Sequence, residues 1–345
     1  MNYNSIRNGI SNIRLDREKQ FIAFFRLICK QWANLRVLDV IIIDQQVFLF
    51  CFQAEGVLTK QKAALLSIIS NSFLIIFKII AGLLMNSISV ISEAIHSGID
   101  LIASIVAFVS IKKASLPQDE DHPFGHGKYE NVSGAFEAIL IFFAGCLIIY
   151  ESIKKIIHLP ELQSIEAGIG VMLISSLVNI FVSRTLFKVA KDTDSIALEA
   201  DAWHLLTDVY TSAGVMIGLG IIKFTNLTII DPITAMLVAG LIIKASIDLT
   251  RKSMKDLVDE SLPKDEVQTI IDIIQTHSLI KGYHKLRTRK SGNKREIDIH
   301  LQVNKDSSVS EIHDLCDHIE KDIKAVLSNA NVVIHIEPAQ EKTTP

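Results

Sequence analysis

The sequence is poor in the residues that mark secreted, zinc-finger and nucleic-acid-binding proteins. It has 345 residues and only four cysteines, Cys29, Cys51, Cys146 and Cys316, which are scattered and form no CxxC pair. Cysteines in this arrangement are typical of unpaired thiols and argue against a disulfide framework or a cysteine-rich zinc finger. The net charge is only −3 and no block of basic residues occurs, so nothing indicates a nucleic-acid partner.

The first 59 residues lack both a signal peptide and a clear membrane span. Val37–Phe52 is apolar but shorter than the ~20 residues that a spanning helix needs, and Asp44 interrupts it. The charged stretch before it is too long for a signal peptide, and no small-residue cleavage pattern follows. We expect residues 1–59 to be an N-terminal extension on the cytosolic side.

Long apolar runs dominate the middle of the chain. Hydrophobic residues make up 49% of the sequence, and the mean hydropathy of +0.34 is ordinary for a membrane protein with a soluble part. We predict a six-helix transmembrane bundle over residues 60–253. Both termini would then lie on one side, and the excess of lysine and arginine in the loops of that side places it in the cytosol. The six runs are Ala63–Met85, Ser87–Ile111, Gly134–Ile153, Ile165–Leu186, Ile196–Ile222 and Thr228–Ile247.

The composition changes after Arg251, where a small soluble domain is predicted. Pro263 opens a helix-like stretch, and a turn signal at 291–293 precedes an alternating strand pattern over 297–303. The apolar spacing within 312–326 predicts an amphipathic helix, and a second alternating pattern closes the domain. We predict a cytosolic α+β domain of order α-β-β-α-β over residues 254–338, followed by a frayed tail, 339–345.

Two of the apolar runs carry the same pair of ionisable residues. His96 and Asp100 are four residues apart, as are His204 and Asp208, so each pair shares one face of its helix. A carboxylate at bilayer depth costs ~3 kcal/mol on insertion scales, so two cost ~6 kcal/mol unless something offsets this. Two imidazoles and two carboxylates would make a four-ligand site for a divalent metal, near-tetrahedral for zinc. The alternative is two independent structural pairs, in which each histidine bonds its own aspartate or a neighbouring helix.

Two further acidic residues, Glu93 and Asp201, lie in the same two runs. Glu93 lies on a neighbouring face three residues before His96, and Asp201 lies near the start of its helix. We expect both to make water-mediated or interhelical hydrogen bonds rather than to bind metal directly.

The loop between the second and third runs, PQDEDHPFGHGKYE, is rich in histidine and aspartate. Two histidines four residues apart can share a metal if the segment turns back, which Gly125 and Gly127 would allow. The alternative is a solvated, charged loop. The candidate ligands are Asp119, Asp121, His122 and His126.

The soluble domain holds a third group of candidate ligands. Four histidines, His284, His300, His313 and His335, lie on different predicted elements, and Glu337 shares a strand face with His335. A lone surface histidine usually has no special role. Four on the polar faces of elements that meet in one small domain indicate a metal site.

The motifs SEAIHSGID, DEDHPFGHGKYE, EADAWHLLTD, HKLRTRKSG, IDIHL and VVIHIEP resemble those of the cation diffusion facilitators, a family of proton-coupled metal exporters. The resemblance runs from about Thr59 to Pro338 and is strongest to the bacterial ferrous-iron/zinc efflux pumps of this family. It implies the same fold: six transmembrane helices followed by a metallochaperone-like cytosolic domain. The extension before Thr59 has no counterpart in the family.

The resemblance also implies a role for each group of residues. Lys128 and Asp259 match an interlocking charge pair that holds the family's dimer together. Two positions depart from the pattern, because close relatives often carry Asp at the position of His96 and some carry Asp at that of Glu337. The implied sites are the transport site His96, Asp100, His204 and Asp208, the loop site Asp119, His122 and His126, and a binuclear dimer-interface site His284, His300, His313, His335 and Glu337.

We therefore expect an antiporter that exports a divalent transition metal, most of all Zn²⁺, from the cytosol in exchange for protons. Zinc would be both the transported ion and a ligand of the cytosolic domain. We expect a homodimer, joined through the cytosolic domain and the membrane base, in a bacterial inner membrane.

Three alternatives stay open at this stage. The first is an exporter of Fe²⁺, Mn²⁺, Cd²⁺ or Co²⁺ from the same family. The second is a membrane-bound metal sensor that does not transport. The third, an intramembrane metalloenzyme, is disfavoured because an HExxH motif is absent and the fully ligated quartet leaves no position for a catalytic water.

Overall fold

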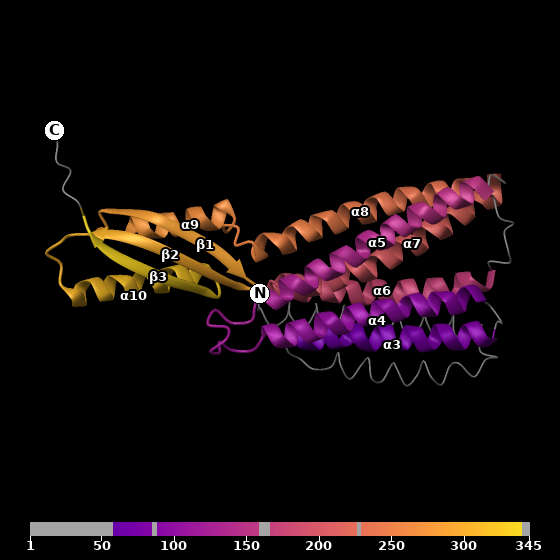
Figure 1. The fold of residues 1–345 in the computed structure, drawn as a ribbon, viewed down its shortest axis with the longest axis horizontal. Coiled ribbons are helices and arrows are strands. Elements are labelled where there is room, and N and C mark those ends of the chain that lie inside the picture. Colours follow the sequence, from indigo (N-terminus) through magenta and orange to yellow (C-terminus); the bar gives the residue numbers. More distant parts are fainter. Residues whose placement is uncertain (1–57, 85–87, 159–165, 226–228, 340–345) are drawn as a thin grey trace, which may run out of the picture. The chain divides into compact units, whose positions relative to one another are not determined.

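A computed structural model describes residues 58–84, 88–158, 166–225 and 229–339 (Figure 1). The described residues belong to one compact unit. Nearly all of the predicted N-terminal extension, including Val37–Phe52, lies outside the described residues, and so does the tail beyond residue 339.

Six long helices precede the C-terminal domain, as predicted. They extend beyond the apolar runs: α5 begins at Lys128 rather than at Gly134, and α8 ends at Leu257 rather than at Ile247. The difference arises because hydrophobicity marks the part of a helix that lipid surrounds, whereas backbone hydrogen bonding continues through polar turns. The six are α3 (Lys60–Leu84), α4 (Ile88–Ala114), α5 (Lys128–His158), α6 (Glu166–Thr193), α7 (Ile196–Thr225) and α8 (Ile230–Leu257).

Among the residues that the structure describes, five helices, α3, α4, α5, α6 and α8, are long and apolar enough to cross a membrane. Helix α7 carries Asp201, His204 and Asp208 within its apolar run. Large apolar side chains such as Ile95 and Leu237 are more than half exposed on the surface of the bundle. A lipid-facing surface explains this exposure, since water would make it costly.

Helix α7 lies at the centre of the bundle. Its Leu198 and Leu205 belong to an apolar cluster shared with α3, α4 and α6. Its Ile196 and Ala200 belong to a second cluster, shared with α5 and α8. Any movement of α7 therefore changes the packing of both halves of the bundle.

The C-terminal domain has the predicted order, α-β-β-α-β. Its sheet has the strand order β1-β2-β3, with β1 antiparallel and β3 parallel to β2. The parallel pair needs a crossover, which α10 supplies. The turn predicted at 291–293 joins β1 to β2, and Gly292 has a φ of +61° there. The elements are α9 (Lys264–Thr276), β1 (Gly282–Ser291), β2 (Lys294–Val303), α10 (Val309–Val326) and β3 (Ala330–Pro338).

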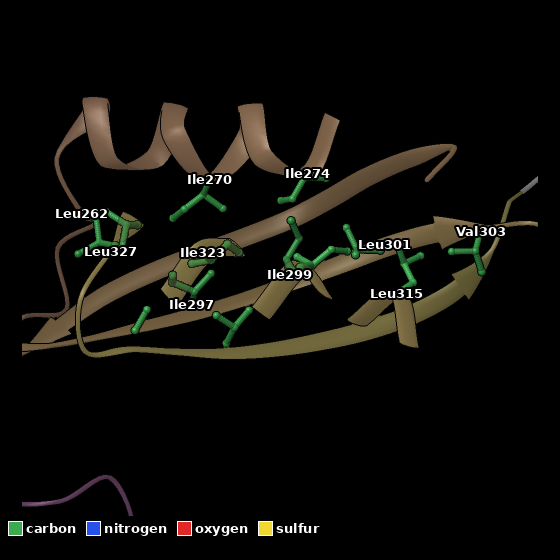
Figure 2. Packing of buried hydrophobic residues seen from close by; sticks show 13 residues of the cluster. Leu262, Ile270, Ile274, Ile297, Ile299, Leu301, Val303, Leu315, Ile323 and Leu327 are labelled. Carbon is green, nitrogen blue, oxygen red and sulfur yellow. The ribbon is translucent and has the colours of Figure 1, made fainter. Parts of the chain in front are cut away.

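One face of this sheet carries the apolar core of the domain (Figure 2). Ile297, Ile299 and Leu301 alternate along β2, point to the same face and are at most 1% exposed. They pack against Ile270 of α9 and Ile319 of α10, so both helices cover this face. The opposite face of the sheet keeps the polar residues of the alternation.

Candidate metal-binding sites

The first polar cluster lies inside the bundle, where α4 faces α7. One ligand atom each of His96, Asp100 and Asp208 lie within 4.8 Å of one another. His204 joins them, because its Nε2 lies 2.9 Å from Asp100 Oδ1. The structure thus brings together the four side chains that the repeated spacing singled out.

Two of the four members of this cluster are buried. Asp100 is 3% exposed and His204 is 6% exposed, whereas Asp208 is half-buried and His96 is exposed. The ring atom His204 Nδ1 is buried and has no hydrogen-bond partner among the described residues. The His204–Asp100 contact alone would fit the structural-pair alternative, but that alternative does not explain why His96 and Asp208 gather at the same point. Two carboxylates this close favour an added positive charge.

Two polar residues outside the predicted set support the cluster. Asn179 on α6 donates from Nδ2 to Asp208 Oδ2 over 3.4 Å. Lys78 on α3 is 5% exposed and donates to Ser97 Oγ over 2.7 Å, next to His96 in the sequence. The sequence showed both as polar residues within apolar runs, but not which helix they face.

Both additional acidic residues make interhelical bonds, as predicted. Glu93 accepts from Lys78 Nζ at 3.2 Å, and Asp201 accepts from Ser104 Oγ at 3.1 Å. Neither residue belongs to the group of ligand atoms around Asp100.

The loop before α5 folds back on itself. Ligand atoms of Asp119, His122 and His126 lie within 4.8 Å of one another, and the two imidazole centroids are 4.3 Å apart. Gly125 has a φ of +81°, which lets the chain reverse between the histidines. Asp121 is exposed and stands outside this group.

Hydrogen bonds hold the loop site in shape. Burial acts to raise the pKa of Asp119, but hydrogen bonds from the backbone and the ring of His122 outweigh it and lower that pKa. The second imidazole also approaches this carboxylate, because His126 Nε2 lies 3.3 Å from Asp119 Oδ2. Asp119 is thus an ionised acceptor between two imidazoles, which is a suitable ligand set for a divalent transition metal.

The third cluster lies on the open face of the C-terminal sheet. His284 is paired in register with His300, and His300 with His335, so the three imidazoles form a row across the strands. Glu337 lies beside the row, with Oε1 2.8 Å from His300 Nδ1 and Oε2 3.2 Å from His284 Nε2. The hydrogen bond with His300 lowers the pKa of Glu337.

His313 lies apart from this cluster within one chain. It is on α10, its side chain is 74% exposed, and its Nε2 lies 3.8 Å from Asp317 Oδ2. The predicted binuclear site includes a dimer interface, which a single chain does not contain. The role of His313 there stays a prediction.

The predicted charge pair forms within the chain. Lys128 Nζ, at the start of α5, lies 2.8 Å from Asp259 Oδ1, just after α8. Arg289 of β1 lies 3.3 Å from the other oxygen of Asp259. One carboxylate thus joins the beginning of α5, the end of α8 and the first strand of the C-terminal domain.

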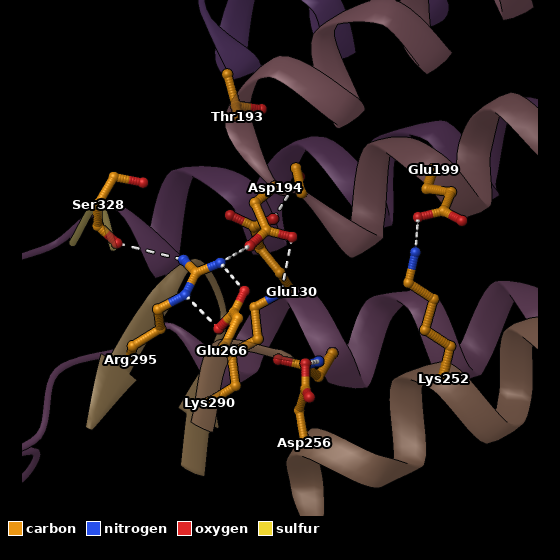
Figure 3. Close-up of polar contacts among 12 residues, drawn as sticks. Glu130, Thr193, Asp194, Glu199, Lys252, Asp256, Glu266, Lys290, Arg295 and Ser328 are labelled. Atoms are coloured by element: carbon orange, nitrogen blue, oxygen red, sulfur yellow. Dashed lines mark hydrogen bonds and ion pairs between the residues drawn. The ribbon is translucent and has the colours of Figure 1, made fainter. Parts of the chain in front are cut away.

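A second set of ionic contacts, which no sequence pattern predicted, joins the helical bundle to the C-terminal domain (Figure 3). Asp194, in the turn between α6 and α7, accepts from Lys290 Nζ at 2.7 Å and lies 3.7 Å from Arg295. Arg295 also forms a two-point contact with Glu266. Asp194 has a φ of +53°, a conformation that aspartate tolerates better than most residues, so it can occupy this tight turn.

Models of known protein families match both the helical bundle and the C-terminal domain. Residues 64–258 match the cation efflux transmembrane domain, and residues 262–339 match the cytoplasmic domain of cation efflux proteins.

The relatives cover most of the described chain. The uncharacterized transporter sll1263 of Synechocystis is 33% identical over 257 residues, 74% of this chain and 83% of the relative. The cation-efflux pump FieF of Salmonella paratyphi A is 28% identical over 277 residues, 80% of this chain and 92% of the relative. Among solved structures, a putative zinc transporter, CzrB, is 32% identical and covers 23% of this chain and 100% of its own, with a TM-score of 0.23. The chain belongs to the cation efflux family, the cation diffusion facilitators, and is a multi-pass membrane transporter rather than an enzyme.

Proposed function

We propose that this transporter exports a divalent transition metal, most of all Zn²⁺, from the cytosol in exchange for protons. The observation that carries the proposal is the convergence of His96, Asp100, His204 and Asp208 from two helices inside the bundle. Asp100 and His204 of this site are buried, and a buried carboxylate in a membrane helix is costly without a bound cation. The four residues are the proposed transport site.

The ligands themselves supply the exchange. An imidazole must be neutral and a carboxylate ionised to bind a metal, so metal and protons compete for the same atoms. When the site opens to the cytosol, metal binds and protons leave. When it opens to the other side, protons bind to the imidazoles, whose ordinary pKa is ~6.5, and expel the metal.

The choice of Zn²⁺ rests on ligand type. Mixed nitrogen and oxygen ligands in a four-membered set favour zinc, and Mg²⁺ and Ca²⁺ prefer oxygen alone. Fe²⁺, Mn²⁺, Cd²⁺ and Co²⁺ are alternative substrates of the same site. The relative FieF is named a cation-efflux pump, which supports export of a cation but does not specify which metal.

The C-terminal domain is proposed to sense metal. One ligand atom each of His284, His300 and Glu337 lies within 4.8 Å of the others. His313 and His335 would complete a binuclear site with a second copy of the chain. The match to a cytoplasmic dimerisation domain supports assembly through this domain. Metal shared between two copies would favour the joined arrangement by mass action. We place this domain and both termini in the cytosol, and the bundle in a bacterial inner membrane.

Zinc and proton fluxes in vesicles containing the purified protein test the transport proposal. The wild type should take up Zn²⁺ with counter-movement of protons, and Asp208→Ala should abolish both. Asp272→Ala is the matched control, because this exposed carboxylate in the C-terminal domain accepts a hydrogen bond from the amide of Gln268 and lies outside the membrane domain. Zinc binding without flux in the wild type would favour a membrane-bound sensor. Flux that survives Asp208→Ala would place the transport site elsewhere.

A further inference from the structure

Glu137 on α5 is an acidic residue that the proposed transport site does not use. It is 0% exposed, and neither of its carboxylate oxygens has a hydrogen-bond partner among the described residues. An isolated ionised carboxylate in a dry interior is so unfavourable that such a group takes up a proton instead. The position of Glu137 in the third apolar run gave no hint of this burial.

A second buried carboxylate lies on α7, which packs against α5. Asp201 is 0% exposed, and its Oδ2 also lacks a hydrogen-bond partner among the described residues. The neighbouring residues Ala138 and Ala200 pack together in one apolar cluster, which brings α5 and α7 into contact at this level. Among the described residues, Asp201 is the charged group whose repulsion acts on an ionised Glu137.

The described basic residues on the surrounding helices are engaged elsewhere or exposed. Lys60 pairs with Glu130, Lys78 pairs with Glu93, and His204 contacts Asp100.

The remaining helices add no compensating charge. Arg184 and Lys188 of α6 are exposed, and Lys252 of α8 pairs with Glu199. The buried face of α8 is uncharged and consists of Pro232, Ala239, Ile242, Ser246, Leu249 and Ser253.

We propose that Glu137, whose buried carboxyl group has no partner for either oxygen, is a second proton-binding site in the membrane domain, separate from the four metal ligands, with Asp201 as a second buried carboxylate on the neighbouring helix. Two buried carboxylates that repel each other do not both stay ionised, so the first proton is held firmly. This inference rests on the proposed function. The exporter would bind one proton at a position where metal does not compete for the same atoms.

The proton on Glu137 also keeps α5 packed against α7. With the proton bound, both carboxyl side chains can stay fully buried, as they are here. Without it, repulsion and the need for hydration favour separation of the two helices. Since α7 also carries His204 and Asp208, loss of this proton would shift the helix that bears half of the transport site.

Difference infrared spectroscopy on the full-length protein in detergent tests the site directly. A protonated carboxyl group gives a carbonyl stretch that an ionised carboxylate lacks. The wild type should show this band near neutral pH, and Glu137→Gln should remove it. Glu130→Gln is the matched control on the same helix, because Glu130 is 4% exposed but pairs with Lys60 at 2.8 Å, and its replacement should leave the band in place.

A second variant and a transport measurement complete the test. Asp201→Asn should shift the band without removing it, which covers the case in which Glu137→Gln fails to fold. Glu137→Gln should bind Zn²⁺ as the wild type does, while the pH dependence of its transport becomes shallower by about one proton. A band that Glu137→Gln leaves unchanged would overturn the proposal. The infrared result stands apart from transport, so an absent zinc flux would count against the proposed function and not against this site.

Discussion

Lys290, near the tip of the β1–β2 hairpin, donates to Asp194 in the turn between α6 and α7 over 2.7 Å. The strand that ends near Lys290 also carries His284 of the sheet cluster. The helix that begins just after Asp194 carries His204 and Asp208. One ion pair therefore connects the proposed sensing cluster, through a strand, to the helix that bears half of the proposed transport site.

Lys290→Met should slow zinc transport without unfolding the protein. Ion pairs at such partly exposed positions contribute ~0–1 kcal/mol to folding, so the free energy of unfolding should change little. The transport rate should fall severalfold, because the β1–β2 hairpin loses its ion pair with Asp194 in the turn before α7. Zinc uptake into vesicles and thermal unfolding in detergent measure the two effects. Arg287→Met is the control, since Arg287 pairs with Asp298 inside the C-terminal domain, and equal rates in both variants would contradict this coupling.

Gly127→Ala should destabilise the same junction by crowding. An added Cβ at Gly127 would lie 2.8 Å from the carbonyl carbon of Ser291, which is backbone and cannot rotate away. Overpacking of this kind costs ~1–3 kcal/mol. Thermal unfolding should show a lower midpoint for this variant. Gly240→Ala is the matched control, because an added Cβ there meets nothing within 4 Å, and its midpoint should not fall.

Local patterns in the sequence predicted most of the fold. Six apolar runs predicted six helices, and the alternation at Ile297, Ile299 and Leu301 predicted the central strand with its buried face. These features are readable because burial imposes a fixed period on each element. The beginning of α5 and the end of α8 were misplaced because the helix continues through turns that lie outside the apolar region.

The candidate sites were predictable only where spacing or motif carried the information. His96 and Asp100 share a helix face, and the two loop histidines are neighbours in the chain, so both groups could be found from sequence. Glu137 and the pair of Asp194 with Lys290 could not, because their partners lie in distant segments. No periodicity relates two residues that tertiary packing alone brings together.

Asn179→Ala should weaken metal binding at the proposed transport site. The amide of Asn179 orients Asp208 through a 3.4 Å hydrogen bond. Loss of a residue that orients a metal ligand costs ~10–100-fold in metal affinity, and this long contact suggests the lower end, about tenfold. Zinc titration by calorimetry on the purified protein measures the effect. Ser176→Ala is the control on the same helix, because the Ser176 hydroxyl is buried without a described partner, and a matching loss there would rule out a specific role for Asn179.

Asp259→Asn should destabilise the protein at neutral pH but not in acid. The hydrogen bond from Lys128 lowers the pKa of Asp259 below its ordinary value, so the folded state favours the ionised form. The stabilisation is present above the unfolded pKa of ~3.9 and is lost as pH falls through the lowered folded pKa. Asparagine suits the exchange because Asp259 has a φ of +58°, which asparagine tolerates.

Thermal unfolding of the wild type and Asp259→Asn at a series of pH values checks this dependence. The difference in midpoint should stay constant from pH ~8 to ~5 and shrink below ~3.9, in proportion to protonation of the carboxylate. Its size should be modest, because the Asp259 side chain is 43% exposed and solvent screens the pair. Asp272→Asn should show no such dependence, since its described partner is a neutral amide. A midpoint difference that grows in acid would mean that the ion pair with Lys128 does not stabilise the folded chain.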